Sequence, residues 1–235
     1  MKSLRRSTMA FLFLTSLAGA MGAQAQGTQP AVVPECLDPS VPRELLTEVD
    51  QAMQTLRQRY AVPERRLRVL EEAFRMWTRP GGSVYGPAVL RVFRYAGAEA
   101  LPFLSDKLLA EGQSIRRAAA MLLRAMEDRT EDPSVQVREI APEEEMTALL
   151  PLLIRTTYDT DAAVRSYVEA QIGTFIAFNG ADTPPRVVDA FCRLLDDPEY
   201  DVREGAAWGL RKLGRDDLIP PALRERMGTT LGPER

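Results

Sequence analysis

Histidine is absent from the 235 residues, and lysine occurs only at Lys2, Lys107 and Lys212. Most general acid–base catalysis depends on histidine, and Schiff-base or Ser-Lys chemistry depends on a lysine. This composition excludes catalytic triads and metal sites that use histidine, and it leaves almost no basis for lysine chemistry. Most classes of enzyme are therefore excluded before any motif is considered.

Two groups of carboxylates could in principle bind a cation or act as an acid–base pair. Glu143, Glu144 and Glu145 open a predicted helix, where anions complement the helix dipole, and the group from Asp196 to Asp201 falls in a predicted turn. The chain has no Gly-rich phosphate loop, no Cys-x-x-Cys pair and no nucleophile elbow. We therefore expect no catalytic residue, no metal site and no cofactor.

The elements that would position any site are helical. Residues 26–42 hold four prolines and little periodicity, which predicts an extended tail, whereas from there to residue 228 apolar residues recur every three or four positions. Proline or aspartate stands where these segments begin and glycine where several end, as in Gly97, Gly112 and Gly214. No strand-like alternation occurs, so an all-α domain is predicted over 43–228, followed by a short tail at 229–235.

Three segments of this domain repeat one another. Each centres on an arginine, namely Arg116, Arg165 and Arg203, with apolar residues one position before it and three, seven and ten positions after it. These four positions form a narrow buried stripe on a helix. The stripes are Ile115, Ala119, Leu123 and Met126; Val164, Val168, Ile172 and Phe175; and Val202, Ala206, Leu210 and Leu213. A degenerate fourth stripe is Val84, Ala88, Val92 and Tyr95.

An apolar helix is predicted before each arginine-centred copy, at 99–109, 143–158 and 185–195, so the repeating unit is a helical hairpin. The clearest copy, over 194–210, joins an acidic turn to Val-Arg and then to alanine and leucine. In this pattern the sequence resembles the HEAT repeat family and its HEAT-like subclass. That resemblance implies a right-handed α-solenoid of about four hairpins with helical caps at both ends. It also implies a structural role for Arg116, Arg165 and Arg203, which would bind acidic turn residues such as Asp161 and Asp201.

A candidate binding surface lies opposite the buried stripe. The positions one, five and eight residues after each arginine point away from it, and small residues at Ala170 and Gly173 would leave a shallow groove there. Its candidate partner-binding residues are Arg117, Met121, Arg124, Trp208 and Arg211. An exposed tryptophan beside arginine is a frequent anchor in protein interfaces. The alternative is that the terminal helix around 218–227 covers Trp208.

The N-terminus resembles an export signal in three zones: the cations Lys2, Arg5 and Arg6, an apolar run over 9–20, and Ala23-Gln24-Ala25. Cleavage is predicted after Ala25, which places the protein in the periplasm or outside the cell, without later insertion into a membrane. An uncleaved anchor is the competing interpretation, but about 12 apolar residues fall short of the roughly 20 that span a bilayer.

The mature chain would carry a net charge of -6, with +5 over residues 41–125 and -9 over 126–235. The arginines are spread along amphipathic helices and follow no nucleic-acid motif, so no nucleic-acid partner is expected. In an exported chain Cys36 and Cys192 could be oxidised, but a stacked solenoid would place the first helix roughly 30 Å from Cys192, and their pairing is left open. Residues 128–141 are predicted to leave the stack as a charged loop.

These features predict a non-enzymatic scaffold or adaptor that binds a protein or peptide in the bacterial cell envelope. One alternative is a structural envelope protein held by its N-terminus. Another follows from the resemblance alone, because HEAT-like proteins include cofactor-handling subunits similar to bilin lyases.

Overall fold

The computed structural model describes residues 41–82, 86–127, 143–179 and 183–230. The chain divides into two units, Met1–Pro30 and Ala31–Arg235, and every described residue belongs to the second. The predicted signal at 1–25, nearly all of the tail at 26–42 and the loop at 128–141 lie outside the described residues. In the part that is described, no helix is both long and apolar enough to cross a membrane.

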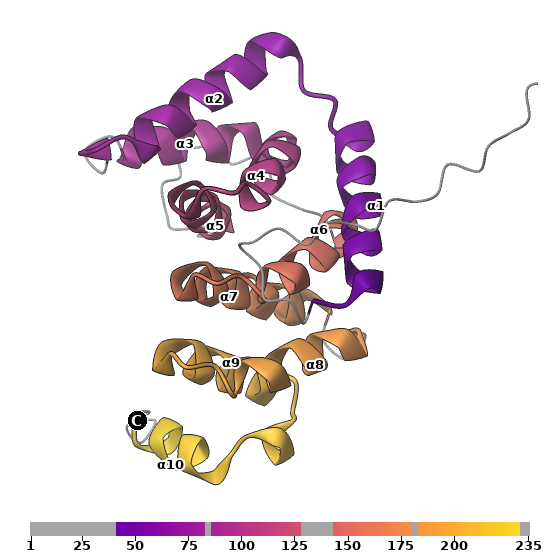
Figure 1. Ribbon diagram of the computed structural model, residues 1–235, viewed down its shortest axis with the longest axis vertical. Coiled ribbons are helices and arrows are strands. Elements are labelled where there is room, and N and C mark those ends of the chain that lie inside the picture. Colours follow the sequence, from indigo (N-terminus) through magenta and orange to yellow (C-terminus); the bar gives the residue numbers. More distant parts are fainter. Residues whose placement is uncertain (1–40, 83–85, 128–142, 180–182, 231–235) are drawn as a thin grey trace, which may run out of the picture. The chain divides into compact units, whose positions relative to one another are not determined.

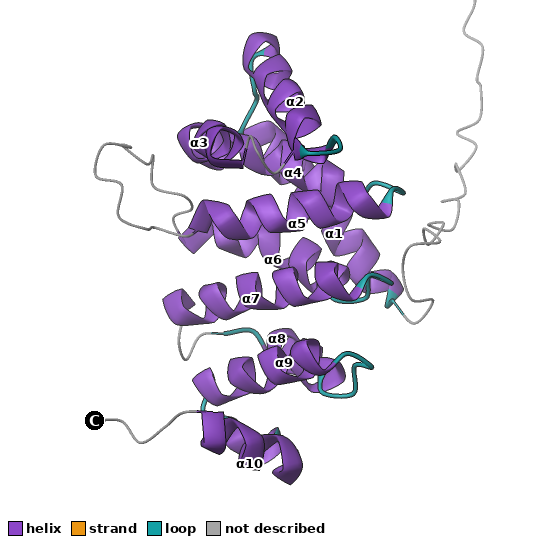
Figure 2. Cartoon of the chain, turned by 90° about the vertical axis from the view of Figure 1, so that its left-hand side faces the viewer, coloured by secondary structure: helices purple, strands orange, loops and turns teal. Residues whose placement is uncertain are grey.

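The described residues form helices and no strand (Figure 2). The helices are α1 Arg43–Arg59, α2 Glu64–Thr78, α3 Gly86–Ala96, α4 Leu101–Leu108, α5 Gln113–Glu127, α6 Glu143–Thr156, α7 Ala162–Asn179, α8 Pro185–Leu194, α9 Tyr200–Lys212 and α10 Pro221–Thr230, with short 3-10 turns at Gly97–Ala100 and Asp216–Leu218. Pro42, Pro63 and Pro184 stand just before helices, where a missing N–H costs little. Gly97 and Gly214 follow α3 and α9 with positive φ, a conformation that glycine adopts without strain.

Successive helices pair into the hairpins α2–α3, α4–α5, α6–α7 and α8–α9 (Figure 1). Their second helices form one layer, in which α3 contacts α5, α5 contacts α7, and α7 contacts α9. The expectation of an all-α solenoid of about four hairpins is confirmed. Its handedness remains a prediction.

The buried stripe lies where the arginine-centred repeats place it. In α7 Val164, Val168, Ile172 and Phe175 are all buried, and in α5 and α9 the central positions are buried while Ile115 and Leu213 pack against the core from its edge. Each of these helices therefore buries one apolar face between its neighbours, and this packing outweighs the poor helix propensity of β-branched Val164 and Val168.

The predicted stripe of α3 is wrong by one residue. Val84 is outside the described residues, Ala88 is exposed, and the side chain of Tyr95 is 75% exposed, whereas Val89 and Phe93 are buried. The ring of Phe93 lies 6.1 Å from that of Phe103 in α4, so burial of a large aromatic ring sets the rotation of this helix.

The N-terminal helices were expected to cap the stack, but α1 lies along its side. It lies against α4 and α6, the first helices of two hairpins, and buries Val49, Met53 and Leu56 there (Figure 1). Arg57 pairs with Asp106 of α4 at 2.6 Å, and Glu48 pairs with Arg186 of α8. Helix α1 therefore runs across three hairpins.

Because α1 runs along the stack, distance no longer argues against a disulfide between Cys36 and Cys192. The pair between Glu48 and Arg186 brings the N-terminal part of α1 next to α8, the helix that carries Cys192. The roughly 30 Å separation expected for a simple stack is therefore wrong. Cys36 lies outside the described residues, so the pairing itself stays open. Burial raises the pKa of the Cys192 thiol.

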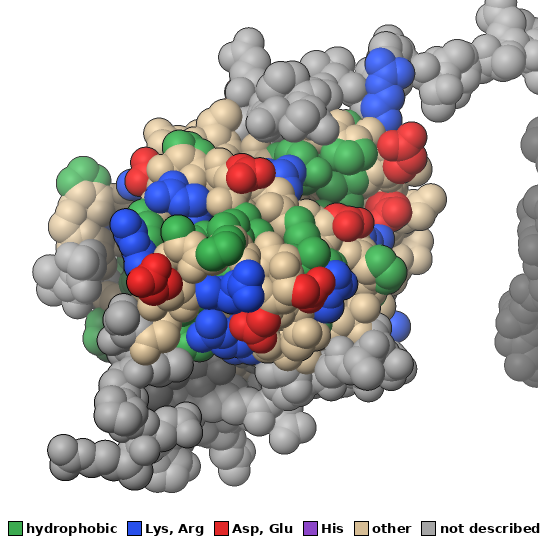
Figure 3. All heavy atoms as spheres, turned by 90° about the horizontal axis from the view of Figure 1, so that it is seen from below, with side chains coloured by type: hydrophobic (Ala, Val, Ile, Leu, Met, Phe, Trp, Pro, Cys, Tyr) green, Lys and Arg blue, Asp and Glu red, His purple; other side chains and the backbone are tan. Residues whose placement is uncertain are grey.

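Helix α10 closes the C-terminal end by packing on α9. Ile219, Leu223 and Met227 are buried, while Arg224, Glu225 and Arg226 are exposed. Seen from this end, acidic and basic side chains are intermixed around small apolar patches (Figure 3). A mixed polar outer face is what the terminal element of a repeat stack needs for solubility.

Candidate functional site

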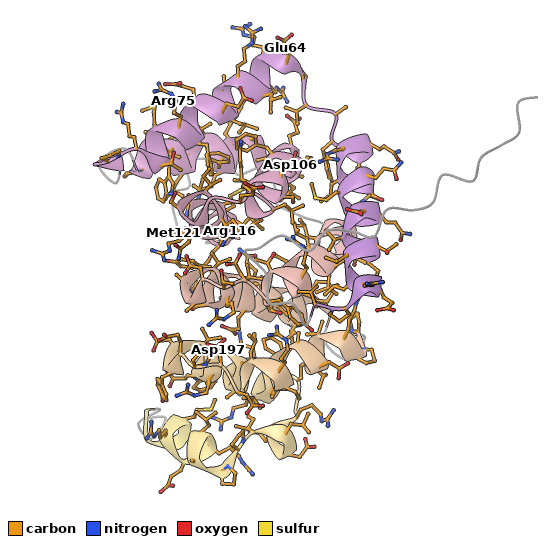
Figure 4. All side chains as sticks on the ribbon, viewed as in Figure 1. Glu64, Arg75, Asp106, Arg116, Met121 and Asp197 are labelled. Carbon is orange, nitrogen blue, oxygen red and sulfur yellow. The ribbon has the colours of Figure 1, made fainter. Side chains whose placement is uncertain are left out.

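Two buried arginine–aspartate pairs connect successive hairpins. Arg116 in α5 donates from Nε and Nη2 to the carboxylate of Asp159 at 2.6 and 3.0 Å, and neither side chain is more than 2% exposed. Arg165 in α7 makes the same forked contact with Asp197 at 2.6 and 2.8 Å (Figure 4 labels Arg116 and Asp197). We call these two pairs the arginine ladder. A bidentate contact of this kind fixes both distance and orientation.

Each acceptor aspartate is held by its own turn. Asp159 also accepts the N–H of Asp161 at 2.8 Å, and Asp197 accepts the N–H of Glu199 at 2.9 Å. The arginines bind backbone as well, because Nη1 of Arg116 donates to the carbonyl of Glu111 at 2.6 Å and Nη1 of Arg165 to that of Asp159 at 2.8 Å. Each ladder arginine therefore closes its own turn and joins the next one.

The acceptors differ from those that the resemblance implied. Asp161 is buried but binds Arg117, at 2.8 Å, instead of Arg116, and Asp201 is exposed in the first turn of α9. The true acceptors, Asp159 and Asp197, stand six residues before the arginine of the following repeat. Arg203, in the last hairpin, donates to the carbonyls of Asp197 and Pro198 in its own turn and does not join a further hairpin.

An open groove runs across α5, α7 and α9 on their faces opposite the buried stripe, with a volume of about 750 Å³. It brings together three of the predicted partner-binding residues, Met121, Arg124 and Trp208, over a floor that includes Ala170 and Gly173. Met121, labelled in Figure 4, stands on α5 with Arg116. Trp208 is half-buried, so α10 does not cover it fully.

The other two predicted residues do not line the groove. Arg117 is engaged by Asp161, and Nε of Arg211 lies 3.0 Å from the carboxylate of Asp216. The guanidinium of Arg211 also lies 5.1 Å from the ring centre of Trp208, a cation–π distance. Arg211 therefore supports one wall of the groove from outside, and its charge is balanced.

Glycines allow the side chains of the groove to lie where they do. A Cβ at Gly205 would collide with the carboxylate of Glu169, and a Cβ at Gly209 would lie 2.5 Å from the ring of Phe191. At Gly173 the nearest atom to such a Cβ is the Lys212 amine, 3.7 Å away. Glu169 is thus seated against α9, and the Lys212 amine lies over the groove floor.

Glu169 is the most unusual side chain of the groove. It is only 7% exposed, and among the described residues it makes no hydrogen bond and no ion pair. Burial raises the pKa of this carboxyl from 4.5 to about 7, although the charges of Arg124 and Lys212 oppose the shift. Near neutral pH the groove therefore holds a carboxyl group that is partly protonated.

A profile of the HEAT repeat matches residues 187–216, which span most of α8, the turn with Asp197, and α9. Residues 187–216 are a HEAT repeat. The hairpins before this HEAT repeat share its pairing of helices, and Arg116 in α5 and Arg165 in α7 stand at the position that Arg203 has in α9. Comparison with the curated proteins and with the solved structures found no match.

Sequence reasoning missed Glu169, Tyr167 and Lys212 as groove residues. One signal was present in the comparison of the three arginine-centred repeats. Four residues after the arginine, the copies in α5 and α9 have Ala120 and Ala207, and only the copy in α7 has a glutamate. A charged residue in an otherwise small and buried column indicates a special local role. Its space, however, comes from Gly205 on another helix.

A second cavity, of about 890 Å³, lies between α2 and α3. Val69 and Tyr95 line it and are 51% and 75% exposed, and Arg66 at its edge pairs with Glu99. It belongs to the hairpin whose HEAT resemblance is weakest. Because its lining shares no residue with that of the groove, this surface supplies control positions for experiments on the groove.

Proposed function

We propose that this protein is a non-enzymatic interaction scaffold of the bacterial cell envelope, and that it binds a polypeptide segment in the groove of α5, α7 and α9. HEAT repeats generally mediate protein–protein interaction, and stacked repeats present extended surfaces suited to it. The envelope location is drawn from the three-zone N-terminus and the small residues Ala23 and Ala25.

The observation that carries the proposal is that three successive repeats contribute to one cavity. Met121 from α5, Ala170 from α7 and Trp208 from α9 lie around the same space of about 750 Å³. Half-buried aromatic residues in a preformed depression are the usual anchors of protein interfaces, because they bury large area at little cost in conformational entropy. The arginine ladder holds these helices in fixed register, so the groove is formed before any partner binds.

Site-specific photo-crosslinking in cells tests this function. A photoreactive amino acid at Ala170, on the groove floor, should crosslink a defined polypeptide, and the matched position Tyr95, exposed on α3, should not. The crosslink at Ala170 should disappear in the Trp208→Ala variant. Crosslinks that form equally at Tyr95, or that persist without Trp208, would contradict a role for the groove in binding.

A further inference from the structure

We propose that the segment bound in the groove is acidic, and that one of its aspartate or glutamate carboxylates sits between Arg124 and Lys212 and against Glu169. This inference rests on the proposed function and names the chemistry of its partner. It follows from which charges of the groove are balanced and which are not.

The unbalanced charges of the groove are positive. Arg124 on α5 and Lys212 on α9 are exposed, and within the described part of the chain neither forms an ion pair. The adjacent cations differ, because Arg117 is paired with Asp161 and Arg211 with Asp216. The two remaining cations line the groove from the helices on either side of α7, and the Lys212 amine lies over Gly173 on the floor.

Glu169 is the only acidic residue that lines the groove in the described structure. With Glu169 ionised the three groups sum to one positive charge, and with it protonated they sum to two. A carboxylate entering the groove would therefore meet a favourable field in either state. A lysine or arginine side chain would gain one carboxylate but would also approach both cations, with no second acidic side chain to balance them.

The protonation state of Glu169 decides how well an anion fits. Protonated, its hydroxyl can donate a hydrogen bond to the ligand carboxylate; ionised, it repels that carboxylate. The charged groups that act on Glu169 are Arg124 from α5 and Lys212 from α9, and no described charge of α6, which packs on α7 from the other side, is among them. Tyr167 is the other titratable residue of the groove on α7 itself.

The apolar part of the groove adds a second requirement. Met121 and Trp208 stand on the two flanking helices beside the cations. A segment in which an acidic residue adjoins a large apolar residue would fill both parts. Binding of the anion further raises the pKa of Glu169, so it takes up a proton, and affinity falls as the pH rises through about 7.

Fluorescence anisotropy with three labelled synthetic peptides of equal length tests the inference on the full mature protein. One peptide contains glutamate and leucine, and in the other two glutamine or lysine replaces glutamate. The glutamate peptide should bind most tightly, and between about pH 6 and about pH 8 its affinity should fall by about tenfold. Glu169→Gln should bind it at both pH values about as tightly as the unaltered protein does at the lower one.

Charge-removing variants give the second readout. Arg124→Gln and Lys212→Met should each weaken the glutamate peptide by about tenfold, whereas Arg65→Gln, the loss of an exposed arginine on α2, should leave it unchanged. Circular dichroism establishes that each variant is folded.

The outcomes separate this inference from the proposed function. A glutamine or lysine peptide that binds as tightly as the glutamate peptide, no binding of the glutamate peptide, or affinity that rises with pH would each overturn the acidic partner. The groove as a binding site would remain supported if the crosslink at Ala170 still depends on Trp208. Loss of that dependence would instead remove the proposed function.

Discussion

Neutralising the acceptor of the first ladder pair should be far more costly than neutralising an exposed one. Asp159→Asn keeps the size of the side chain and the oxygen that accepts the N–H of Asp161, but it removes the counter-charge of Arg116. Both side chains are at most 2% exposed, so water cannot replace the lost partner. Removing one partner of a buried ion pair costs about 3–5 kcal/mol, and we expect that loss in the free energy of unfolding.

Urea denaturation followed by circular dichroism measures this change, and Asp216→Asn is the matched control. Asp216 pairs with Arg211 at 3.0 Å, but these side chains are 49% and 28% exposed, so the control should cost less than about 1 kcal/mol. Arg116→Met combined with Asp159→Asn should be more stable than Asp159→Asn alone, because the buried arginine charge is then removed together with its carboxylate. A loss for Asp159→Asn no larger than that of the control would refute the structural role of the ladder.

Three further predictions concern pH, packing and export. The pKa of Glu169 is about 7 in the folded chain and 4.5 when the carboxyl is exposed, so its contribution to stability is complete at low pH and is lost as the pH rises through 7. Thermal melts should therefore show Glu169→Gln more stable than the unaltered protein at about pH 8, by up to about 3 kcal/mol. Equal stability at that pH would contradict the burial of this carboxyl. In Gly209→Ala the new Cβ meets the Phe191 ring, so the substitution should lower the unfolding free energy by about 1–3 kcal/mol. In Gly205→Ala the new Cβ meets only the carboxylate of Glu169, which can move, so the loss should be smaller. The reverse order of the two losses would count against this packing. Mass spectrometry of the exported protein should find Gln26 at its N-terminus, and a full-length product in the cytosol would refute export.

The buried faces of α5, α7 and α9 could be predicted from the sequence because their three arginine-centred copies agree with one another. The period that places Val168 and Ile172 on one face of α7 also places Ala206 and Leu210 on one face of α9, and all four are buried. In α3 no arginine fixes the alignment, and two stripes one residue apart are both apolar. Only the contact of Phe93 with Phe103 selects between them, and that contact lies between two helices.

The site was less predictable because its geometry depends on turns and on residues of different repeats. Asp159 and Asp161 stand in the same turn, and the path of the backbone decides which of them meets Arg116. The burial of Glu169 depends on the absence of a side chain at Gly205, which a single helix cannot show. Met121 and Trp208 could be placed in the groove because helical phase alone directs them away from the buried stripe.

The central claim is that the groove binds a polypeptide through Trp208, and the Trp208→Ala variant tests it most directly when affinity and stability are measured on the same preparation. For the polypeptide captured at Ala170, the variant should lose about 2 kcal/mol or more of binding free energy, as at interface hot spots, while its melting temperature changes little. The half-buried position of Trp208 on the groove wall is the reason for this expectation. A melting temperature that falls steeply while affinity is retained would show that Trp208 is core, and it would contradict the account.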